Sequence, residues 1–281
     1  MDIATALAKA AADLAAVKIA EPRKEAASLL AFSLDQSSVF LYAHPEYVLT
    51  RDEAAKFAGY VSRRANREPF QYITGKQEFF GLEFAVRPGI LIPRPETEIL
   101  VETAIHFLKP LALPRFCELG VGSGCISISI LNAVKDAAAL GVDISPAALV
   151  LTEENAAAHG AASSLQLVEC DLFEKVTGRF DMIVSNPPYI SEADRKDLQP
   201  EVKDFEPPGA LFAGGDGLDI IRRIIADSPP FLLPNSYLLI EIGFGQAADV
   251  KDLFGDSVWQ SVALLPDLQG IPRIVVAQLS R

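Results

Sequence analysis

The sequence has few of the residues on which metal sites, disulfide frameworks and membrane segments depend. Its 281 residues include only three cysteines and three histidines, and no two cysteines have C-x-x-C spacing. An odd number of unclustered cysteines argues against both a disulfide framework and a zinc site. We therefore expect no metal, and we expect Cys117, Cys125 and Cys170 to be buried, inert thiols. The N-terminus shows no secretory signal, and no apolar run reaches the roughly 20 residues that span a bilayer. These absences favour a cytoplasmic protein with no membrane partner.

Positive charge is also scarce. Lysine and arginine total 25 against 37 acidic residues, so the formal net charge is −12. Such a chain repels phosphate backbones, and we expect no direct nucleic-acid partner. The densest basic stretch, residues 63–67, is too short for a nucleic-acid arm. Its pattern favours an exposed helix face, with a partner-docking patch as the alternative. The length and the apolar content of 50% suit a folded protein with one large and one small domain.

Residues 1–75 are rich in helix-forming residues and show no strand pattern. Alanine and leucine are abundant, and glycine occurs only at Gly59 and Gly75. Thr50 and Glu53 have the spacing of a capping box, which predicts a helix that runs to about residue 67. We therefore predict a small helical N-terminal domain over residues 1–75.

The composition changes over residues 76–95. Aromatic and β-branched residues surround Gly81, Pro88 and Gly89 form a turn signal, and residues 90–92 are again apolar. This pattern predicts two short strands, one on each side of the turn, that form a hairpin-like linker.

From residue 96 to 281, apolar strand patterns alternate with helical patterns. The alternation predicts an α/β fold, a doubly wound sheet with right-handed crossovers. One predicted helix, residues 146–159, has Ser145 as its N-cap, Pro146 at its first position and Gly160 after its end. Residues 191–218 are rich in proline and glycine and predict a long functional loop. The predicted strands are 116–119, 139–144, 165–169, 181–185, 237–242, a weaker one from about Ser257 to 265, and 274–279.

A glycine-rich loop follows the first of these strands. Glycines at alternate positions let a ligand approach the main chain closely. Nicotinamide-binding loops have G-x-G-x-x-G spacing, whereas the third glycine here comes one residue earlier. This spacing resembles that of S-adenosylmethionine methyltransferases, in which the loop cradles the methionine part of the cofactor; a purely structural turn is the alternative. The predicted cofactor-binding residues in this loop are Gly120, Val121, Gly122, Ser123 and Gly124.

Acidic residues at strand ends add to this prediction. Asp143 ends the next strand, where a carboxylate can accept hydrogen bonds from both ribose hydroxyls; the alternative is an acid that merely precedes a helix cap. Asp171 and Leu172 follow the third strand, where they suit the amino group and the flat face of adenine, although a plain strand exit would need no such role. Glu118 could orient the ammonium group of the cofactor or be structural.

The strongest signal is a tetrapeptide that follows the fourth strand, Asn186-Pro187-Pro188-Tyr189. Two prolines cannot continue a central strand, and they hold the main chain stiffly where the strand ends. The alternative is a rigid strand-exit turn with no chemistry.

The tetrapeptide suits the methylation of an amide or of an exocyclic amine. The lone pair of such a nitrogen is delocalised, so it is a poor nucleophile. The side-chain oxygen of Asn186 and the backbone carbonyl of Pro187 can accept hydrogen bonds from the two N–H groups of the substrate nitrogen, and Tyr189 can pack over the planar group. Alignment and stabilisation of the developing positive charge would then suffice for catalysis, and no histidine is required.

The chain resembles the release-factor glutamine methyltransferase (PrmC/HemK) family along nearly its whole length. The resemblance implies a seven-stranded Rossmann-like methyltransferase domain over residues 96–281, and a helical domain that docks the release factor. It also implies S-adenosyl-L-methionine as cofactor and transfer of its methyl group to the N5 amide nitrogen of the glutamine in a Gly-Gly-Gln motif. The family's cofactor contacts map onto 120–124, Asp143, Asp171, Leu172 and Asn186, and its substrate contacts map onto 186–189. Some members carry tryptophan where this chain has Leu172. The segments that carry the resemblance are 71–75, 78–82, 88–98, the glycine loop, 142–146, 186–189 and 216–218.

Two alternatives remain open from the sequence. A DNA adenine-N6 methyltransferase would share the glycine loop and the tetrapeptide, but it would be expected to carry a basic recognition region. A non-catalytic binding module would bind cofactor without turnover. We expect a monomer, although the sequence does not settle the oligomeric state.

Overall fold

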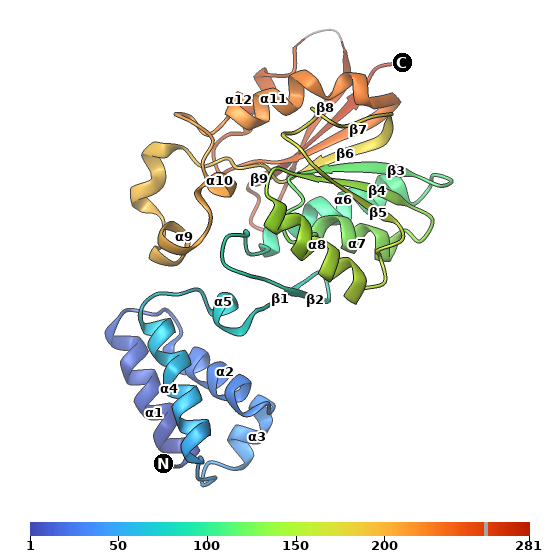
Figure 1. Ribbon diagram of the computed structural model, residues 1–281. Helices are drawn as coiled ribbons and strands as arrows, with labels where there is room; N and C mark the ends of the chain where they lie inside the picture. Colours follow the sequence, from blue (N-terminus) through green and yellow to red (C-terminus); the bar gives the residue numbers. More distant parts are fainter. Residues whose placement is uncertain (256–257) are drawn as a thin grey trace. The chain divides into compact units, whose positions relative to one another are not determined.

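The computed structural model describes residues 1–255 and 258–281 and divides the chain into two compact units (Figure 1). Met1–Lys76 and Gln199–Phe205 form the first unit, and Gln77–Leu198 and Glu206–Arg281 form the second. The chain therefore leaves the second unit after residue 198, contributes seven residues to the first unit, and returns at Glu206. We call these the helical unit and the sheet unit.

The helical unit is a small bundle with its own core. The helices α1, α2 and α4 contribute most of the buried apolar side chains, among them Leu14, Leu30 and Phe57. The predicted capping box is confirmed: the Thr50 side chain caps α4, and the Glu53 carboxylate accepts the Thr50 N–H at 2.8 Å. The helices of the first 76 residues are α1 (Ile3–Ala16), α2 (Pro22–Leu34), α3 (Ser38–Ala43), α4 (Arg51–Ala65) and α5 (Phe70–Thr74).

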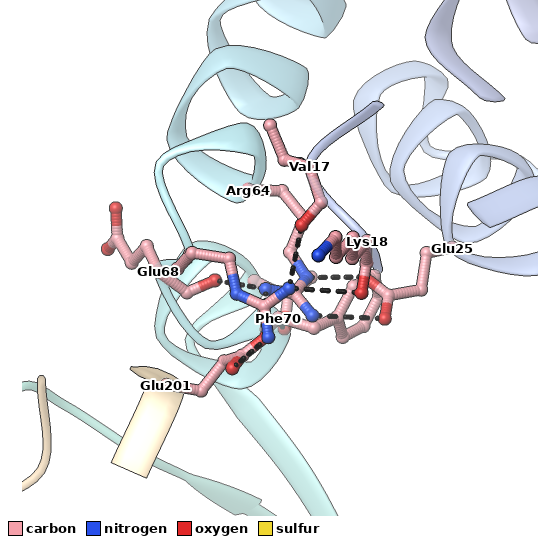
Figure 2. A network of polar contacts seen from close by, with 9 residues as sticks. Val17, Lys18, Glu25, Arg64, Glu68, Phe70 and Glu201 are labelled. Carbon is pink, nitrogen blue, oxygen red and sulfur yellow. Dashed lines mark hydrogen bonds and ion pairs between the residues drawn. The ribbon is translucent and has the colours of Figure 1, made fainter. Parts of the chain in front are cut away.

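A buried ion-pair network holds α9 (Pro200–Phe205) in the helical unit (Figure 2). Arg64, whose side chain is only 7% exposed, donates to the carboxylates of both Glu25 and Glu201. Arg67 donates to the other oxygen of Glu201 at 2.6 Å. The prediction that residues 63–67 form an exposed helix face is therefore wrong for Arg64, because two carboxylates compensate its charge inside the unit.

The predicted hairpin has a different position from the one expected. Its strands are β1 (Lys76–Phe79) and β2 (Leu82–Ala85), and both lie before the Pro88-Gly89 turn. Phe80 and Gly81, with φ of +51° and +74°, form the connection between them. Residues 90–92 form no strand, so the second predicted strand is wrong. Ile90 and Ile92 are buried, which explains their apolar character.

The sheet unit contains a seven-stranded sheet with the order β5-β4-β3-β6-β7-β9-β8. All neighbouring strands are parallel except β9, which lies antiparallel between β7 and β8. Each of the seven predicted strands is present, although the proposed start of one at Ser257 lies outside the described residues. The strands are β3 (Arg115–Leu119), β4 (Ala138–Asp143), β5 (Leu165–Glu169), β6 (Phe180–Ser185), β7 (Leu232–Glu241), β8 (Trp259–Pro266) and β9 (Pro272–Leu279).

Helices cover both faces of this sheet, and alternate residues of each strand separate two cores. Phe116 and Met182 pack with α6 (Glu98–Leu108), α7 (Cys125–Ala133) and α8 (Pro146–Ala158) on one face. Cys117 and Ile183 pack with α11 (Asp219–Asp227) and α12 (Ala247–Asp252) on the other. Burial on both faces explains why the central strands β3, β6 and β7 are mostly apolar towards their carboxyl ends. All three cysteines are buried free thiols, as predicted.

The region 191–218 is not a plain loop, contrary to the prediction. It contains η2 (Glu192–Asp197), α9 and α10 (Pro208–Leu211), each of six residues or fewer. Pro200 and Pro208 stand at the first positions of α9 and α10, where a missing N–H is tolerated, and Pro207 is the N-cap of α10. Short 3-10 helices also precede α6 (η1, Pro95–Thr97) and β7 (η3, Pro229–Phe231). Within residues 1–255 and 258–281, we find no helix that has both the length and the apolarity to cross a membrane.

Candidate active site

The register of the central strands brings four chain segments to one edge of the sheet. Leu119 at the end of β3 is paired with Val142 of β4 and with Ser185 of β6, and Ser185 is paired with Ile240 of β7. The segments that follow these four residues therefore start side by side. In an open α/β sheet this carboxyl edge is where ligands bind.

The glycine loop enters α7 through a left-handed residue. Gly124 has φ +81° and is the N-cap of α7. A Cβ atom on it would lie 2.8 Å from both Ile128 Cδ1 and Thr152 Cγ2, so only glycine fits this position without movement of its neighbours. The Thr152 hydroxyl donates to the carbonyl of Gly122 at 3.0 Å. This contact fixes the loop from the side of α8.

Asp143 stands at the end of β4 beside this loop. Its Oδ2 accepts the N–H of Gly122 and its Oδ1 accepts the N–H of Ser145, both at 2.9 Å. Burial raises the pKa of Asp143, and the backbone N–H donors of Gly122 and Ser145 act in the opposite direction. Each carboxylate oxygen can accept one further hydrogen bond, and the two hydroxyls of a ribose could donate these hydrogen bonds. Ser145 is also the N-cap of α8, as predicted.

Glu118 is the most buried carboxyl group at this edge. It is 1% exposed, and Ser127 donates to it through its backbone N–H at 2.9 Å and through its hydroxyl. Burial raises the pKa of Glu118 to about 8, although the hydrogen bonds from Ser127 lower it. A cationic ligand placed beside this group would favour its charged form.

The strand-exit residues after β5 are arranged around an ion pair. Asp171 Oδ2 accepts from Arg223 Nη2 at 2.8 Å, and Leu172 has a positive φ of +46°. Ile220 and Arg223 of α11 line the same cavity as Asp171 and Leu172. Asp171 Oδ1 is therefore the oxygen that could accept the expected hydrogen bond from the amino group of adenine.

The tetrapeptide is held by hydrogen bonds at both of its ends. Asn186 Nδ2 donates to Thr97 Oγ1 at 3.0 Å, which leaves Oδ1 as the acceptor available to a ligand. Gln246 Nε2 donates to the carbonyl of Tyr189 at 2.8 Å. The Tyr189 hydroxyl lies 3.4 Å from Glu241 Oε1, and burial of the ring raises the pKa of this hydroxyl above its usual value.

A cavity of about 500 Å³ joins these groups at the carboxyl edge. Ten of the twelve residues predicted for the site line it, and Gly124 and Tyr189 do not. The Tyr189 ring packs against the core beside α11 and α12 instead, so its proposed packing over a substrate amide stays a prediction, as do the roles of the other residues. The predicted residues that line the cavity are Gly120, Val121, Gly122, Ser123, Asp143, Asp171, Leu172, Asn186, Pro187 and Pro188.

Sequence reasoning missed two walls of the cavity. Residues of the segment 89–97, including Arg94 and Thr97, form one wall, and Ile220 and Arg223 of α11 contribute to another. The first wall lies within the segment 88–98, which carries much of the family resemblance. The sequence therefore marked this segment as characteristic of the family, but it did not show that the segment lines the site. No sequence pattern points to Ile220 or Arg223, because an amphipathic surface helix explains them equally well.

The charges around the cavity suit a cationic cofactor without phosphates. Glu118 and Asp143 line it as carboxyl groups. Two arginines also line it, but each is paired with an acidic residue, Arg94 with Glu206 and Arg223 with Asp171. The carboxyl groups at the glycine loop would complement the ammonium and ribose groups of S-adenosyl-L-methionine, whereas a pyrophosphate would be repelled. The residues present therefore fit this cofactor.

Comparisons with known proteins agree with this geometry. Residues 5–75 match the family described as "PrmC N-terminal domain", and residues 97–202 match "Methyltransferase small domain". A release factor glutamine methyltransferase of Geobacter sulfurreducens is 43% identical over 93% of this chain and 91% of its own. The protein of the same name from Koribacter versatilis is 40% identical over 99% of both chains. The crystal structure of a methyltransferase from Pyrococcus furiosus, at 16% identity, superimposes with a TM-score of 0.53 over 71% of this chain and 89% of that one, which shows a shared fold.

The sheet order, the glycine loop and the acidic cavity define an S-adenosyl-L-methionine-dependent methyltransferase with a Rossmann-like fold. Within that class, the chain belongs to the release factor glutamine methyltransferase (PrmC/HemK) family, because relatives of about 40% identity match it over nearly its full length.

Proposed function

We propose that this chain transfers the methyl group of S-adenosyl-L-methionine to the N5 amide nitrogen of the glutamine in the Gly-Gly-Gln motif of peptide chain release factors. The observation that carries the proposal is the position of Asn186. It lines the cavity that the glycine loop also lines, and its Nδ2 is already bonded to Thr97. Its free oxygen is then the complement of a carboxamide NH2 group.

The residues of this chain act by binding and aligning the substrate amide. When bound, the cofactor supplies an electrophilic methyl group on a sulfonium. Asn186 Oδ1 and the carbonyl of Pro187 accept hydrogen bonds from the two N–H groups of the substrate amide. These hydrogen bonds fix the direction of the nitrogen lone pair. Because these acceptors are held before the substrate arrives, they stabilise the positive charge that develops on nitrogen without reorganisation.

The helical unit is proposed to dock the release factor. It matches the N-terminal family domain, and it exposes large apolar side chains on and near α3, namely Val39, Tyr42 and Val48. We also propose a cytoplasmic location, where a release factor would be met, and a monomeric state. Docking predicts a lower KM for an intact release factor than for a short peptide that carries the Gly-Gly-Gln motif.

Mass spectrometry of a purified release factor after incubation with enzyme and cofactor tests the activity. We expect a mass increase of one methyl group on the glutamine of the motif. Asn186→Ala should lower turnover by about 100-fold, the scale for loss of one preorganised group, with a smaller effect on cofactor affinity, to which the glycine loop and Asp143 also contribute. Asn132→Ala is the matched control, because Asn132 does not line the cavity. Methylation of DNA but not of the release factor would support the adenine-N6 alternative and refute the proposal.

A further inference from the structure

The side chain of Gln246 joins three separate segments beside the tetrapeptide. Gln246 lies in the turn after β7 and is the N-cap of α12. Its Nε2 donates to the carbonyl of Tyr189 at 2.8 Å, and its Oε1 accepts the backbone N–H of Gly243 at 2.8 Å. The same Nε2 lies 3.5 Å from the carbonyl oxygen of Asp216. One amide group therefore connects the tetrapeptide with the turn after β7 and with the segment before α11.

The contacts of Gln246 require a donor and an acceptor in one side chain. The carbonyl groups of Tyr189 and Asp216 can only accept, and the N–H of Gly243 can only donate. A glutamine amide suits both kinds of partner. A glutamate has the same size, but its carboxylate offers only acceptors, so one of its oxygens would face the carbonyl oxygen of Tyr189. The arrangement therefore depends on the amide and not only on the space that the side chain fills.

Two glycines leave room for this amide. A Cβ atom on Gly217, which has φ +77°, would lie 2.9 Å from Gln246 Nε2 and would overlap the carbonyl oxygen of Tyr189. A Cβ atom on Gly243 would lie 2.8 Å from Gln246 Oε1 and 3.1 Å from Tyr189 Cδ2. Both neighbouring segments thus approach the amide with bare backbone, which only glycine permits without movement of these groups.

A hydrogen bond holds each end of the tetrapeptide. At one end the Asn186 side chain donates to Thr97 at 3.0 Å, and at the other end Gln246 holds the carbonyl of Tyr189. Between the two ends stand two prolines, whose rings fix φ, and the second proline keeps the first in an extended conformation. The carbonyl between the two prolines can therefore change its direction mainly through movement of one end. This carbonyl is the second acceptor in the proposed reaction.

The residue after the tetrapeptide extends the same connection. Ile190 donates its N–H to the carbonyl of Leu211 at 2.9 Å, and its own carbonyl accepts the N–H of Ala213 at 3.0 Å. These two hydrogen bonds hold the exit of the tetrapeptide to the segment 211–213. Gln246 is the contact that joins the tetrapeptide itself to the end of β7.

We propose that Gln246 is a positioning residue, which fixes the Tyr189 end of the tetrapeptide and thereby aims the Pro187 carbonyl at the amide of the substrate. The proposal rests on the function proposed above, because it assumes that the tetrapeptide holds the methyl acceptor. Neither Gln246 nor Tyr189 lines the cavity, so Gln246 acts through the main chain and not through contact with cofactor or substrate.

Steady-state kinetics of the full-length chain test this role. Gln246→Glu keeps the size and the acceptor for Gly243 but loses the donor, and it should lower kcat by about tenfold to a hundredfold, the scale for a misaligned group. The KM for the release factor and the affinity for S-adenosylhomocysteine should stay unchanged. Gln246→Met, which removes donor and acceptor without adding charge, should lower kcat in the same way. If Gln246→Glu fails to fold, as judged by circular dichroism, Gln246→Met decides.

Gln278→Glu is the matched control for these variants. Gln278 is also a partly buried glutamine of the sheet unit, and its Nε2 donates to the carbonyl of Asn235 at 3.0 Å, but it does not line the cavity. It should keep the kcat of the wild type. A wild-type kcat in Gln246→Glu and Gln246→Met would overturn the inference, and so would an equal loss of kcat in Gln278→Glu.

An NMR measurement separates this inference from the proposed function. The side-chain NH2 signals of Asn186 report the position of the tetrapeptide without turnover. They should shift in Gln246→Glu and stay in place in Gln278→Glu. Signals that do not respond to Gln246→Glu would refute the positioning role. If the wild type failed to methylate the release factor while these signals shifted as expected, only the proposed function would fall.

Discussion

Replacement of Gly124 by alanine tests the packing of the glycine loop against its two neighbouring helices. Gly124 has φ +81°, and a Cβ atom there would approach Ile128 Cδ1 and Thr152 Cγ2 to 2.8 Å. Gly178 offers a matched control, because it has φ +85° and no atom lies within 4 Å of the position of its Cβ. The two variants share the backbone strain and differ in the contact.

The expected losses of stability follow from two contributions, the backbone strain and the steric contact. A left-handed conformation costs alanine about 1–2 kcal/mol, and this term applies to both variants. Overpacking adds about 1–3 kcal/mol at Gly124 only. We therefore expect Gly178→Ala to lower the free energy of unfolding by about 1–2 kcal/mol and Gly124→Ala by about 2–5 kcal/mol, the sum of the two. Displacement of Thr152 would also release the Gly122 carbonyl that its hydroxyl holds.

Urea denaturation followed by circular dichroism measures the stability difference, and calorimetric titration with S-adenosylhomocysteine measures the affinity. We expect Gly124→Ala to be the less stable variant and the only one of the two with weakened binding. Equal stability of the two variants would show that the side chains beside Gly124 move aside without a cost in free energy. Unchanged affinity would show that Thr152 does not shape the loop.

Two further predictions concern buried charges. Arg64→Met should destabilise the protein by about 3–5 kcal/mol in urea denaturation, because it leaves the carboxylates of Glu25 and Glu201 without their shared partner. The control Arg87→Met removes an exposed ion pair and should cost less than about 1 kcal/mol. Equal effects of the two variants would contradict the structural role of the network. Burial raises the pKa of Glu118 to about 8 in the folded protein, from an ordinary value of 4.5, so the folded state holds this proton over an interval where the unfolded chain has lost it. The contribution of Glu118 to stability is therefore present below pH 4.5 and is lost as the pH rises to 8. Thermal unfolding from pH 5 to 8 should show a smaller decline with pH in Glu118→Gln than in the wild type, and identical slopes would argue against the raised pKa.

The strands of the sheet were predictable because burial on both faces imposes a local pattern. Residues 116–119 and 181–185 are mostly apolar, and each forms a strand close to its predicted bounds. The capping box at Thr50 and the N-cap at Ser145 were predictable for a similar reason, since their hydrogen bonds join residues only three positions apart. The misplaced hairpin strand shows the limit of this reasoning. Residues 90–92 are apolar because they are buried, and burial alone does not specify a strand.

The sequence by itself determined which residues belong to the candidate site: a glycine loop, an acid at the end of the next strand, and a tetrapeptide with two prolines. Each is a short segment whose residue types carry the information. Only the tertiary structure decided how these groups are held. Thr97 and Asn186 are 89 positions apart in the chain, and a hydrogen bond joins their side chains beside the end of β6. The pairing of Arg64 with Glu201, 137 positions away, is likewise a contact that no local pattern encodes. Strand register and burial set these contacts, and both depend on the whole fold.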